Sequence, residues 1–324
     1  MKKKFILALC IAVLFAGCSW AAVQEISETP QTSAETQTSE EVKEAMGTIQ
    51  AEKPVTETTA QTTSETEISK ISDEELSQID NTKVNYGQGV QFDPENRPAG
   101  ALDFNSEYEK YNAYALFENA EDTAQNISDS KDASSKTICL TFDLGYEAGY
   151  TGQILDTLKE KDVKAIFFIT GGYVRYADSK IIQRMIDEGH VLGNHGYNHK
   201  SLQALLETSI PDAEKELDDC EAMVKEKFGY QMKYMRPPEG VFSERALALA
   251  QRMGYTTLLY SFAYKDWETN NQPDPQYALE KITAHPHDGE IMLLHGVSKT
   301  NADILPKIID NLREQGFEFK LPSV

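Results

Sequence analysis

Short apolar segments alternate with longer amphipathic segments along the chain from residue 137 to residue 321. The apolar segments predict strands at 137–142, 164–170, 190–194, 232–236, 256–262, 290–295 and 317–321. The amphipathic segments predict helices near 151–161, 179–188, 211–228, 243–253, 275–284 and 303–315. This alternation predicts an α/β domain with a parallel sheet of about seven strands, closed into a barrel.

The N-terminal residues have the pattern of an export signal. Lys2, Lys3 and Lys4 precede an apolar run at 5–16, which is shorter than the ~20 residues of a membrane-spanning helix and is typical of a secretory signal. Residues 15–18, Phe-Ala-Gly-Cys, resemble a bacterial lipobox with phenylalanine where leucine is usual. We therefore expect a lipoprotein signal peptide at 1–18 and anchoring to the outer face of the cytoplasmic membrane through lipidated Cys18. The alternative is an ordinary cleaved signal and a secreted protein.

Residues 19–82 are rich in Ser, Thr, Glu and Gln and have almost no aromatic side chains. Such a composition buries too little apolar surface to offset the entropy lost on folding, so we predict a disordered tether. Within 19–80, 14 acidic residues and three lysines give −11 of the net charge of −21. This acidity argues against nucleic acid as a partner and against a membrane surface bound by charge.

Residues 83–134 are predicted to be an N-terminal extension followed by a linker. Apolar and aromatic positions at 84–87 and at Tyr108, Tyr111 and Tyr114 indicate packing against another part of the protein. The fold of the extension is not readable from the sequence. The catalytic domain is predicted at 135–324.

Residues capable of chemistry follow several of the predicted strands. They are Asp143 after the first strand, His195 and His199 after the third, Arg236 at the end of the fourth, Asp266 with Trp267 after the fifth, and His295 at the end of the sixth. The carboxyl ends of parallel strands meet on one face of a barrel, where active sites are built. We therefore expect these side chains to converge.

Taken singly, these residues allow more than one interpretation. Two histidines four residues apart can bind one metal ion, or can be incidental residues of a polar loop. Arg236 can hold a carboxylate in the site or only stiffen its loop. His295 at a strand end suits a proton donor near neutral pH, whereas His190, His285 and His287 are expected to be structural or exposed.

The sequence also excludes or weakens some classes of chemistry. It has no Gly-rich phosphate loop and no Gly-x-Ser-x-Gly motif, which weakens nucleotide-binding and serine-hydrolase interpretations. Cys139 lies in a predicted strand and Cys220 in a predicted helix, so we expect two buried thiols. A disulfide is the alternative in an exported protein.

The motifs together resemble those of NodB-like polysaccharide deacetylases over about 135–322. The matching motifs, in family order, are Thr141-Phe-Asp143-x-Gly145, His195-x3-His199, Arg236-x-Pro238-x-Gly240, Asp266-Trp267 and Leu293-x-His295. Residues 146–151 and 236–245 are most similar to the delta-lactam-biosynthetic, or muramic, de-N-acetylases. Those enzymes act on N-acetylmuramic acid in peptidoglycan.

The resemblance implies metal-assisted hydrolysis of an N-acetyl amide on a distorted (β/α) barrel, the NodB homology domain. A divalent metal, with zinc as the expected ion, would bind His195 and His199 and polarise the acetamide carbonyl. Asp143 would be the general base and His295 the general acid. The resemblance also assigns supporting roles to Arg236, which would keep Asp143 ionised, and Asp266, which would orient His295, and substrate contacts to Tyr146, Pro238, Trp267 and Leu293.

Leu144 departs from the family pattern, because the family's metal-binding aspartate usually follows the base. Weak metal binding is therefore expected, or a site completed by water or another group. Glu147 is a candidate substitute ligand, and its alternative role is a structural loop carboxylate.

The sequence predicts a peptidoglycan de-N-acetylase, with N-acetylmuramic acid as the expected substrate, in delta-lactam biosynthesis. One alternative is a deacetylase of N-acetylglucosamine polymers. Another is an inactive glycan-binding lipoprotein that lost its metal through Leu144. Retention of Asp143, Arg236, Asp266 and His295 favours an enzyme, because a binding module would need no such set.

Overall fold

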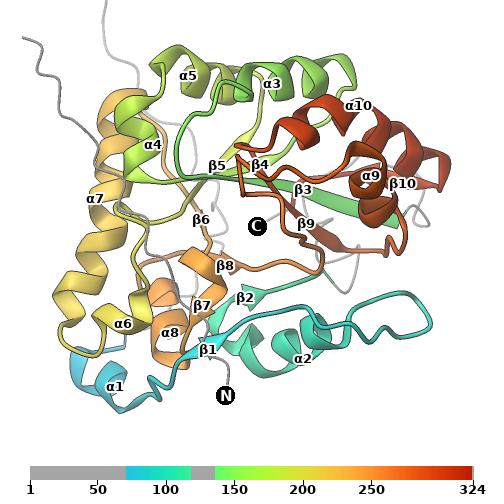
Figure 1. Ribbon diagram of the computed structural model, residues 1–324. Coiled ribbons are helices and arrows are strands. Elements are labelled where there is room, and N and C mark those ends of the chain that lie inside the picture. Colours follow the sequence, from blue (N-terminus) through green and yellow to red (C-terminus); the bar gives the residue numbers. More distant parts are fainter. Residues whose placement is uncertain (1–70, 118–135, 323–324) are drawn as a thin grey trace, which may run out of the picture. The chain divides into compact units, whose positions relative to one another are not determined.

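A curled parallel sheet forms the centre of the domain (Figure 1). The computed structural model describes residues 71–117 and 136–322. The sheet contains β2 (Ala113–Tyr114), β3 (Lys136–Leu144), β4 (Ile166–Ile169), β5 (Val191–Asn194), β6 (Tyr234–Met235), β8 (Thr256–Leu258), β9 (Glu290–His295) and β10 (Phe317–Phe319). The strand order is β10-β3-β4-β5-β6-β8-β2, β9 also pairs with β3, and every pair is parallel.

The segment after β8 pairs with β9 and so connects the two ends of the curled sheet. Phe262 forms a parallel bridge with Met292, and the amide of Leu293 donates to the carbonyl of Phe262 at 2.9 Å. The seven predicted strands are all present, and the prediction of a distorted (β/α) barrel is confirmed. The barrel brings the carboxyl ends of β3, β5, β6 and β9 to one side.

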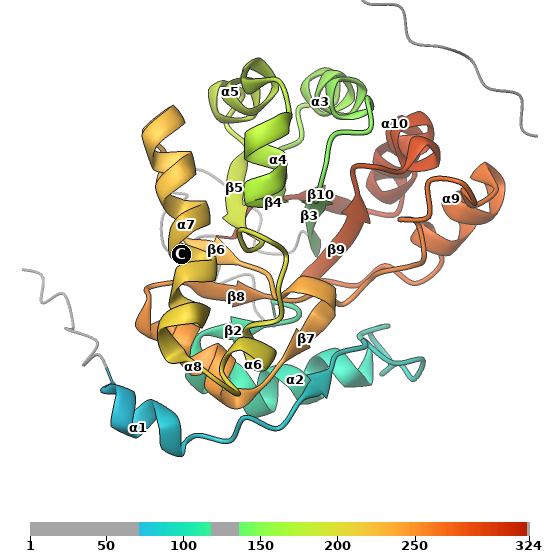
Figure 2. The same ribbon diagram turned by 60° about the vertical axis from the view of Figure 1, so that its left-hand side comes forward.

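Helices cover the outer face of the sheet (Figure 2). They are α3 (Thr151–Glu160), α4 (Gly171–Tyr176), α5 (Ser179–Asp187), α6 (Leu202–Leu205), α7 (Ile210–Phe228), α8 (Glu244–Arg252), α9 (Pro275–Thr283) and α10 (Lys299–Glu314). The predicted helices are present, although α10 begins at Lys299, after its N-cap Ser298, rather than at 303. The short helices α4 and α6 were not predicted, because neither is long enough to show a helical period.

The alternation of side chains along β3 separates two cores. Leu140, Phe142 and Leu144 belong to the large core that includes helix residues, whereas Cys139 belongs to a smaller cluster with Phe168. Asp143, one residue before Leu144, points to the opposite face. Cys139 and Cys220 are both buried and unpaired, so the interpretation as buried thiols is confirmed.

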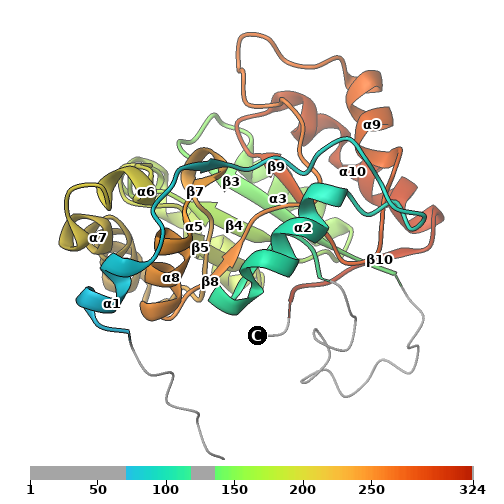
Figure 3. The same ribbon diagram turned by 90° about the horizontal axis from the view of Figure 1, so that it is seen from below.

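The N-terminal extension supplies secondary structure to the domain (Figure 3). Its elements are β1 (Val84–Asn85), α2 (Ala99–Tyr108), the 3₁₀ turn η1 (Glu109–Tyr111) and β2. Strand β2 joins the central sheet beside β8, and β1 pairs antiparallel with β7 (Val241–Phe242). Phe104 and Tyr108 of α2 each make edge-to-face contact with Phe242, at 5.3 and 5.1 Å between ring centroids. The extension therefore packs against the barrel as its aromatic pattern indicated.

The predicted C-terminal limit of the tether, at residue 82, is wrong. Helix α1 (Asp73–Gln78) lies inside that range, and Ser72 and Glu75 form a reciprocal capping box at its start. Leu76 is fully buried, and Asp73 contacts Arg252 of α8 at 2.6 Å. The segment also packs Ile71 and Ile79 against the core, and Arg245 of α8 donates to the carbonyls of Ser77 and Ile79, so these contacts order it although its composition is that of the tether.

The predicted signal peptide, the lipobox at Cys18 and the tether up to residue 70 lie outside the described residues. Among the described residues, no helix has both the length and the apolar character needed to span a membrane.

Candidate active site

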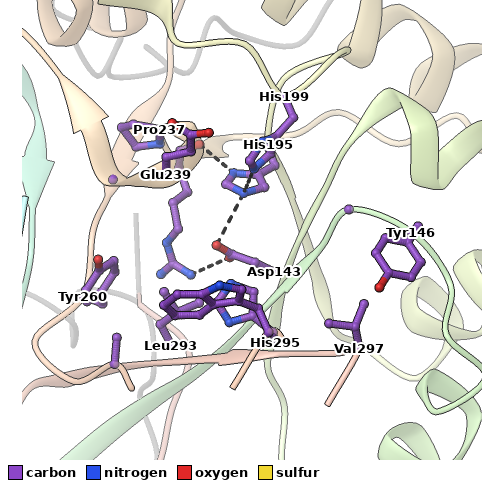
Figure 4. Close-up of a pocket in the computed structure, with 15 residues that line it drawn as sticks. Asp143, Tyr146, His195, His199, Pro237, Glu239, Tyr260, Leu293, His295 and Val297 are labelled. Carbon is purple, nitrogen blue, oxygen red and sulfur yellow. Dashed lines mark hydrogen bonds and ion pairs between the residues drawn. The ribbon is translucent and has the colours of Figure 1, made fainter. Parts of the chain in front are cut away.

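The strand ends surround a pocket of about 510 Å³ (Figure 4). Its lining comes from residues far apart in the sequence: Asp143, Gly145, Tyr146, His195, His199, Arg236, Pro237, Glu239, Gly240, Tyr260, Ala263, Trp267, Leu293, His295 and Val297. The expected convergence of the strand-end residues is therefore observed. Asp266 does not line the pocket and lies fully buried behind His295.

Asp143 is an almost buried carboxylate whose charge is balanced by Arg236. The guanidinium Nη1 donates to Asp143 Oδ1 at 2.8 Å. Burial by itself raises the pKa of Asp143, but the charge and hydrogen bond of Arg236 and the nearby histidines together outweigh burial and hold that pKa below its ordinary value. Asp143 is therefore ionised at neutral pH, with Oδ2 left to face His195 and the pocket (Figure 4).

Every nitrogen of the Arg236 guanidinium donates a hydrogen bond. Nη1 donates also to Thr141 Oγ1 at 2.9 Å, and the carbonyls of Leu258 and Leu259 accept from Nε and Nη2 at 2.9 and 3.0 Å. The guanidinium carbon lies 4.1 Å from the ring centroid of Phe168. Only 1% of this side chain is exposed, so it acts as a fixed charge beneath Asp143 rather than as a mobile loop residue.

His195 presents an unprotonated nitrogen to the pocket. Its Nδ1 lies 2.8 Å from the carbonyl oxygen of Arg236, and because a carbonyl only accepts, Nδ1 carries the proton. Burial lowers the pKa of His195 to about 4, in spite of the nearby carboxylate of Asp143. The neutral ring therefore directs the lone pair of Nε2 toward His199 Nε2 at 3.2 Å and toward Asp143 Oδ2 at 3.4 Å.

Two residues lining the pocket have left-handed backbone conformations. The φ angles of His199 and Glu239 are +59° and +60°. The other non-glycine residues with positive φ in the described ranges are Asn96, Asn112 and Asp162; Asn, Asp and His are the types that adopt it most often, so Glu239 is the unusual one. Strain in His199 and Glu239 therefore coincides with the pocket, as is common at functional sites.

The two histidines fit a divalent cation. Ligand atoms at about 2.0–2.1 Å from a tetrahedral zinc lie roughly 3.3 Å apart, and the two Nε2 atoms are 3.2 Å apart. Within residues 71–117 and 136–322, however, no group of three or more His, Cys, Asp or Glu is placed to hold a metal ion. Imidazole nitrogens suit zinc, so the donor set agrees with the predicted metal while falling short of three protein ligands.

Neither Leu144 nor Glu147 completes that set. Leu144 continues the alternation of β3 and its side chain is fully buried in the outer core. Glu147 Oε1 accepts from the amide of Gly149 at 2.6 Å, and Oε2 accepts from the hydroxyl of Tyr173 at 2.8 Å. Glu147 does not line the pocket, which agrees with its alternative role as a structural loop carboxylate.

His295 is oriented by the buried carboxylate of Asp266. Its Nδ1 lies 2.7 Å from Asp266 Oδ1, and its backbone amide donates to Oδ2 at 2.8 Å. Burial by itself lowers the pKa of His295, but the hydrogen bond and charge of Asp266 outweigh it, so the pKa lies above its ordinary value. Because Nδ1 is engaged, Nε2 is the nitrogen that can give a proton to a group in the pocket.

Three of the four predicted substrate contacts line the pocket. Tyr146 and Trp267 are 54% and 50% exposed, and Leu293 contributes an apolar surface. The prediction for Pro238 is wrong, because this residue is buried in the turn while its neighbours Pro237 and Glu239 line the pocket. Successive residues of a tight turn point in different directions, which the motif alone does not reveal.

The N-terminal extension braces one wall of the pocket. The Tyr86 hydroxyl donates to the carbonyl of Tyr260 at 2.6 Å, and the Gln88 side chain donates to the carbonyl of Ala263 at 3.0 Å. The amide of Tyr86 also donates to the carbonyl of Gly240 at 2.9 Å. Residues of the extension therefore hold three wall residues without entering the pocket.

Sequence reasoning missed several residues of the site. Thr141 could have been found, because it lies two residues before Asp143 and therefore on the same face of β3. Asn301, which donates to Asp266 Oδ2 at 2.5 Å, gives no local signal because α10 brings it there. Tyr260 and Val297 likewise reach the pocket only through the tertiary fold.

Comparison with known proteins agrees with this arrangement. The profile of the polysaccharide deacetylase family matches residues 130–258. The peptidoglycan-N-acetylmuramic acid deacetylase PdaA of Bacillus subtilis is 40% identical over 245 residues, covering 75% of this chain and 85% of that protein. The peptidoglycan-N-acetylglucosamine deacetylase PgdA of Listeria monocytogenes is 32% identical over 189 residues, covering 58% of this chain and 38% of that protein.

A solved structure extends the agreement to three dimensions. The structure of Bacillus subtilis PdaA, a family 4 carbohydrate esterase, matches with a TM-score of 0.65 at 38% identity. The match covers 75% of this chain and 96% of that chain. Identity and fold agree over most of both molecules, and so the chain belongs to the polysaccharide deacetylase family of hydrolases.

Proposed function

We propose that this protein removes the N-acetyl group from N-acetylmuramic acid residues of peptidoglycan. The observation that carries the proposal is one pocket in which a carboxylate kept ionised by Arg236 meets an imidazole whose protonated form Asp266 favours. Hydrolysis of an amide needs such a base and such an acid. The similarity to a muramic acid deacetylase supports the choice of sugar.

His195 and His199 are the residues that would hold a divalent metal, and zinc is the metal we propose. When bound, the metal would act as a Lewis acid that polarises the acetamide carbonyl. The buried ring of His195 is kept in the correct tautomer by the carbonyl of Arg236, so its Nε2 needs no deprotonation before binding.

Asp143 acts as the general base through Oδ2. Arg236 occupies Oδ1, so only the other oxygen can take a proton from a water molecule in the pocket. The water oxygen then attacks the acetamide carbon. Because Arg236 lowers the pKa of Asp143, the carboxylate is ready for this role across the neutral range.

His295 acts as the general acid through Nε2. Breaking the carbon–nitrogen bond leaves an amine, which takes the proton from His295 as acetate is released. Asp266 keeps the ring protonated before the step and fixes its direction during the step. Tyr146, Trp267 and Leu293 offer the surfaces on which the sugar would rest.

Acetate release from defined glycans tests the proposal. Purified protein should release acetate from peptidoglycan strands stripped of stem peptides, and mass spectrometry should locate the loss on muramic residues. Chelation should abolish release, and added zinc should restore it. Faster release from chitin oligomers would move the assignment to N-acetylglucosamine, and no release from any glycan with metal present would favour the inactive glycan-binding alternative.

Export and anchoring through Cys18 form a separate part of the proposal. A lipidated protein should incorporate radiolabelled palmitate in the producing cell, and Cys18→Ala should not. Release of unlabelled wild-type protein into the medium would instead support the ordinary cleaved signal.

A further inference from the structure

The loop after β5 carries both candidate metal ligands, yet it has no regular secondary structure. Its conformation must therefore come from contacts with its surroundings. Glu216, in the first half of α7, is the carboxylate against which this loop folds. Only 4% of Glu216 is exposed.

Glu216 receives hydrogen bonds from successive residues of the loop. Its Oε1 accepts from the amides of Asn198 and Lys200 at 2.6 and 3.1 Å, and Oε2 accepts from the Asn198 side chain at 3.2 Å. Its backbone carbonyl accepts from the amide of Tyr197 at 2.8 Å. The two amides bound by Oε1 lie on either side of His199 in the chain.

This contact accounts for the left-handed backbone of His199. Two amides separated by one residue can point at a single oxygen when the residue between them leaves the extended or helical conformation, as in an anion-binding nest. A non-glycine residue at φ +59° is strained, and the conformation persists only where the surroundings impose it. The Glu216 carboxylate supplies that constraint.

Gly196 fits the same arrangement. A Cβ atom at this position would lie 2.9 Å from Glu216 Oε1, and the φ angle of +78° also favours glycine. The loop sequence and the buried carboxylate are therefore matched to each other. Among the described residues, every hydrogen bond of the Glu216 carboxylate comes from this loop, and no ion pair joins it to a lysine or arginine.

We propose that Glu216 is a positioning residue that sets the direction of the His199 imidazole toward His195. The inference rests on the proposed function, because it takes the two histidines as the metal ligands. Helix α7 would then contribute to metal affinity through Glu216, although it supplies no metal ligand. A carboxylate suits this place because both of its oxygens accept: Oε1 takes the two amides and Oε2 takes the Asn198 side chain.

The test compares Glu216→Gln with Glu226→Gln, an exposed position on the same helix. The first readout is hydrogen exchange at the amides of Asn198 and Lys200 in metal-free protein. Glu216→Gln should raise exchange there by at least about tenfold, because a neutral amide oxygen is a weaker acceptor for the two amides than a carboxylate oxygen, and the amide nitrogen cannot accept from the Asn198 side chain. Unchanged exchange would overturn the inference, whatever the protein does to glycans.

The second readout is zinc affinity by titration calorimetry. Glu216→Gln should weaken zinc binding by roughly 10- to 100-fold, the usual effect of losing a partner behind the ligands, and Glu226→Gln should not. If wild-type protein binds zinc and releases acetate while Glu216→Gln binds zinc as tightly, the inference fails and the proposed function stands. If wild-type protein neither binds zinc nor releases acetate, the proposed function fails, and this affinity arm of the inference fails with it.

A milder variant covers the case in which Glu216→Gln does not fold. Asn198→Ala removes only the side-chain hydrogen bond to Oε2 and leaves both backbone amides in place. It should shift zinc affinity in the same direction by a smaller factor. Wild-type zinc affinity in a folded Asn198→Ala protein, together with unchanged exchange at Lys200, would contradict the positioning role.

Discussion

Strand β9 has a histidine and a carboxylate near each of its ends, and the two pairs behave in opposite ways. At the carboxyl end, His295 faces the pocket with its pKa raised by Asp266. At the amino end, burial lowers the pKa of His287 to about 4 and raises the pKa of Glu290 to about 8. The same residue types are charged at one end and neutral at the other.

The number of hydrogen bonds that each carboxylate accepts explains the difference. Asp266 accepts from the ring and the amide of His295 and from Asn301. Glu290 Oε2 accepts from the amide of His287 at 3.4 Å, and Oε1 has no hydrogen-bond partner. Three donors offset the cost of burying a charge, whereas one long hydrogen bond does not.

The two ends also differ in what covers them. The carboxyl end opens into the pocket, while Glu290 bridges to Leu116 of the extension and the amide of Phe117 donates to the carbonyl of Gly289 at 2.8 Å. His287 was expected to be structural or exposed, and it is a buried structural residue. The carboxyl end of β9 therefore combines hydrogen-bond donors, charge and an opening to the pocket, and the amino end does not.

Removing either proton-transfer group of the pocket should have the largest effect. Asp143→Asn and His295→Ala should each lower acetate release by about 10² to 10⁴-fold, because each removes one proton-transfer group. Circular dichroism should show a folded protein for both variants, but Asp143→Asn should lower the melting temperature because buried Arg236 loses its counter-charge. Activity within a few fold of wild type in a folded variant would remove that residue from the mechanism.

A buried carboxylate without hydrogen-bond donors should also lower the stability of the fold at another position. Leu144→Asp places one in the outer core, where Leu144 is fully buried among apolar side chains. We expect the free energy of unfolding to fall by roughly 3 to 5 kcal/mol, as for other unpaired buried charges. Urea unfolding measures this, with Leu144→Met as a control of similar volume.

The outcome of Leu144→Asp also bears on the metal. Unchanged stability with tighter zinc binding would mean that the end of β3 can turn its side chain to the pocket, as the resemblance to the family had suggested. The described geometry favours a loss of stability, because Asp143 already occupies the pocket face of the strand.

The sequence predicted the features that depend on local pattern and missed those that depend on tertiary contacts. The parallel sheet and the positions of Asp143, His195, His199, Arg236 and His295 followed from local pattern, since strand ends converge by topology. Helix α1 was missed because composition averages over the segment, whereas a few apolar residues and contacts from the distant helix α8 hold it. The donors that set the charge of a carboxylate, such as Asn301, come from distant helices and have no local signature.

Removing the partner of His295 should change the pH dependence of activity. Asp266→Asn takes away the charge that helps to raise the pKa of His295 and leaves at most a weaker hydrogen bond to a neutral oxygen, so the pKa of His295 should fall. The ring would lose its proton at lower pH, and the basic limb of the pH–rate profile should move to lower pH. At pH 8 we expect about tenfold less activity than wild type, with a smaller deficit at pH 6. Identical basic limbs would show that Asp266 only orients the ring.

The neutral pair at the amino end should matter for stability and leave catalysis unchanged. The folded protein keeps a proton on Glu290 up to about pH 8, whereas the unfolded chain releases it near 4.5, so wild-type stability from this group falls as pH rises between those values. His287 has the opposite effect, but only below its ordinary pKa of 6.5.

Between pH 6.5 and 8, the free energy of unfolding of Glu290→Gln should therefore gain about 2 kcal/mol relative to wild type, because glutamine does not titrate. Urea unfolding at both pH values measures this difference, and Glu226→Gln should show none. If the free energy of unfolding depended on pH equally in wild type and Glu290→Gln, the Glu290 carboxylate would have hydrogen-bond donors in the folded protein. The contrast between the two ends of β9 would then be lost.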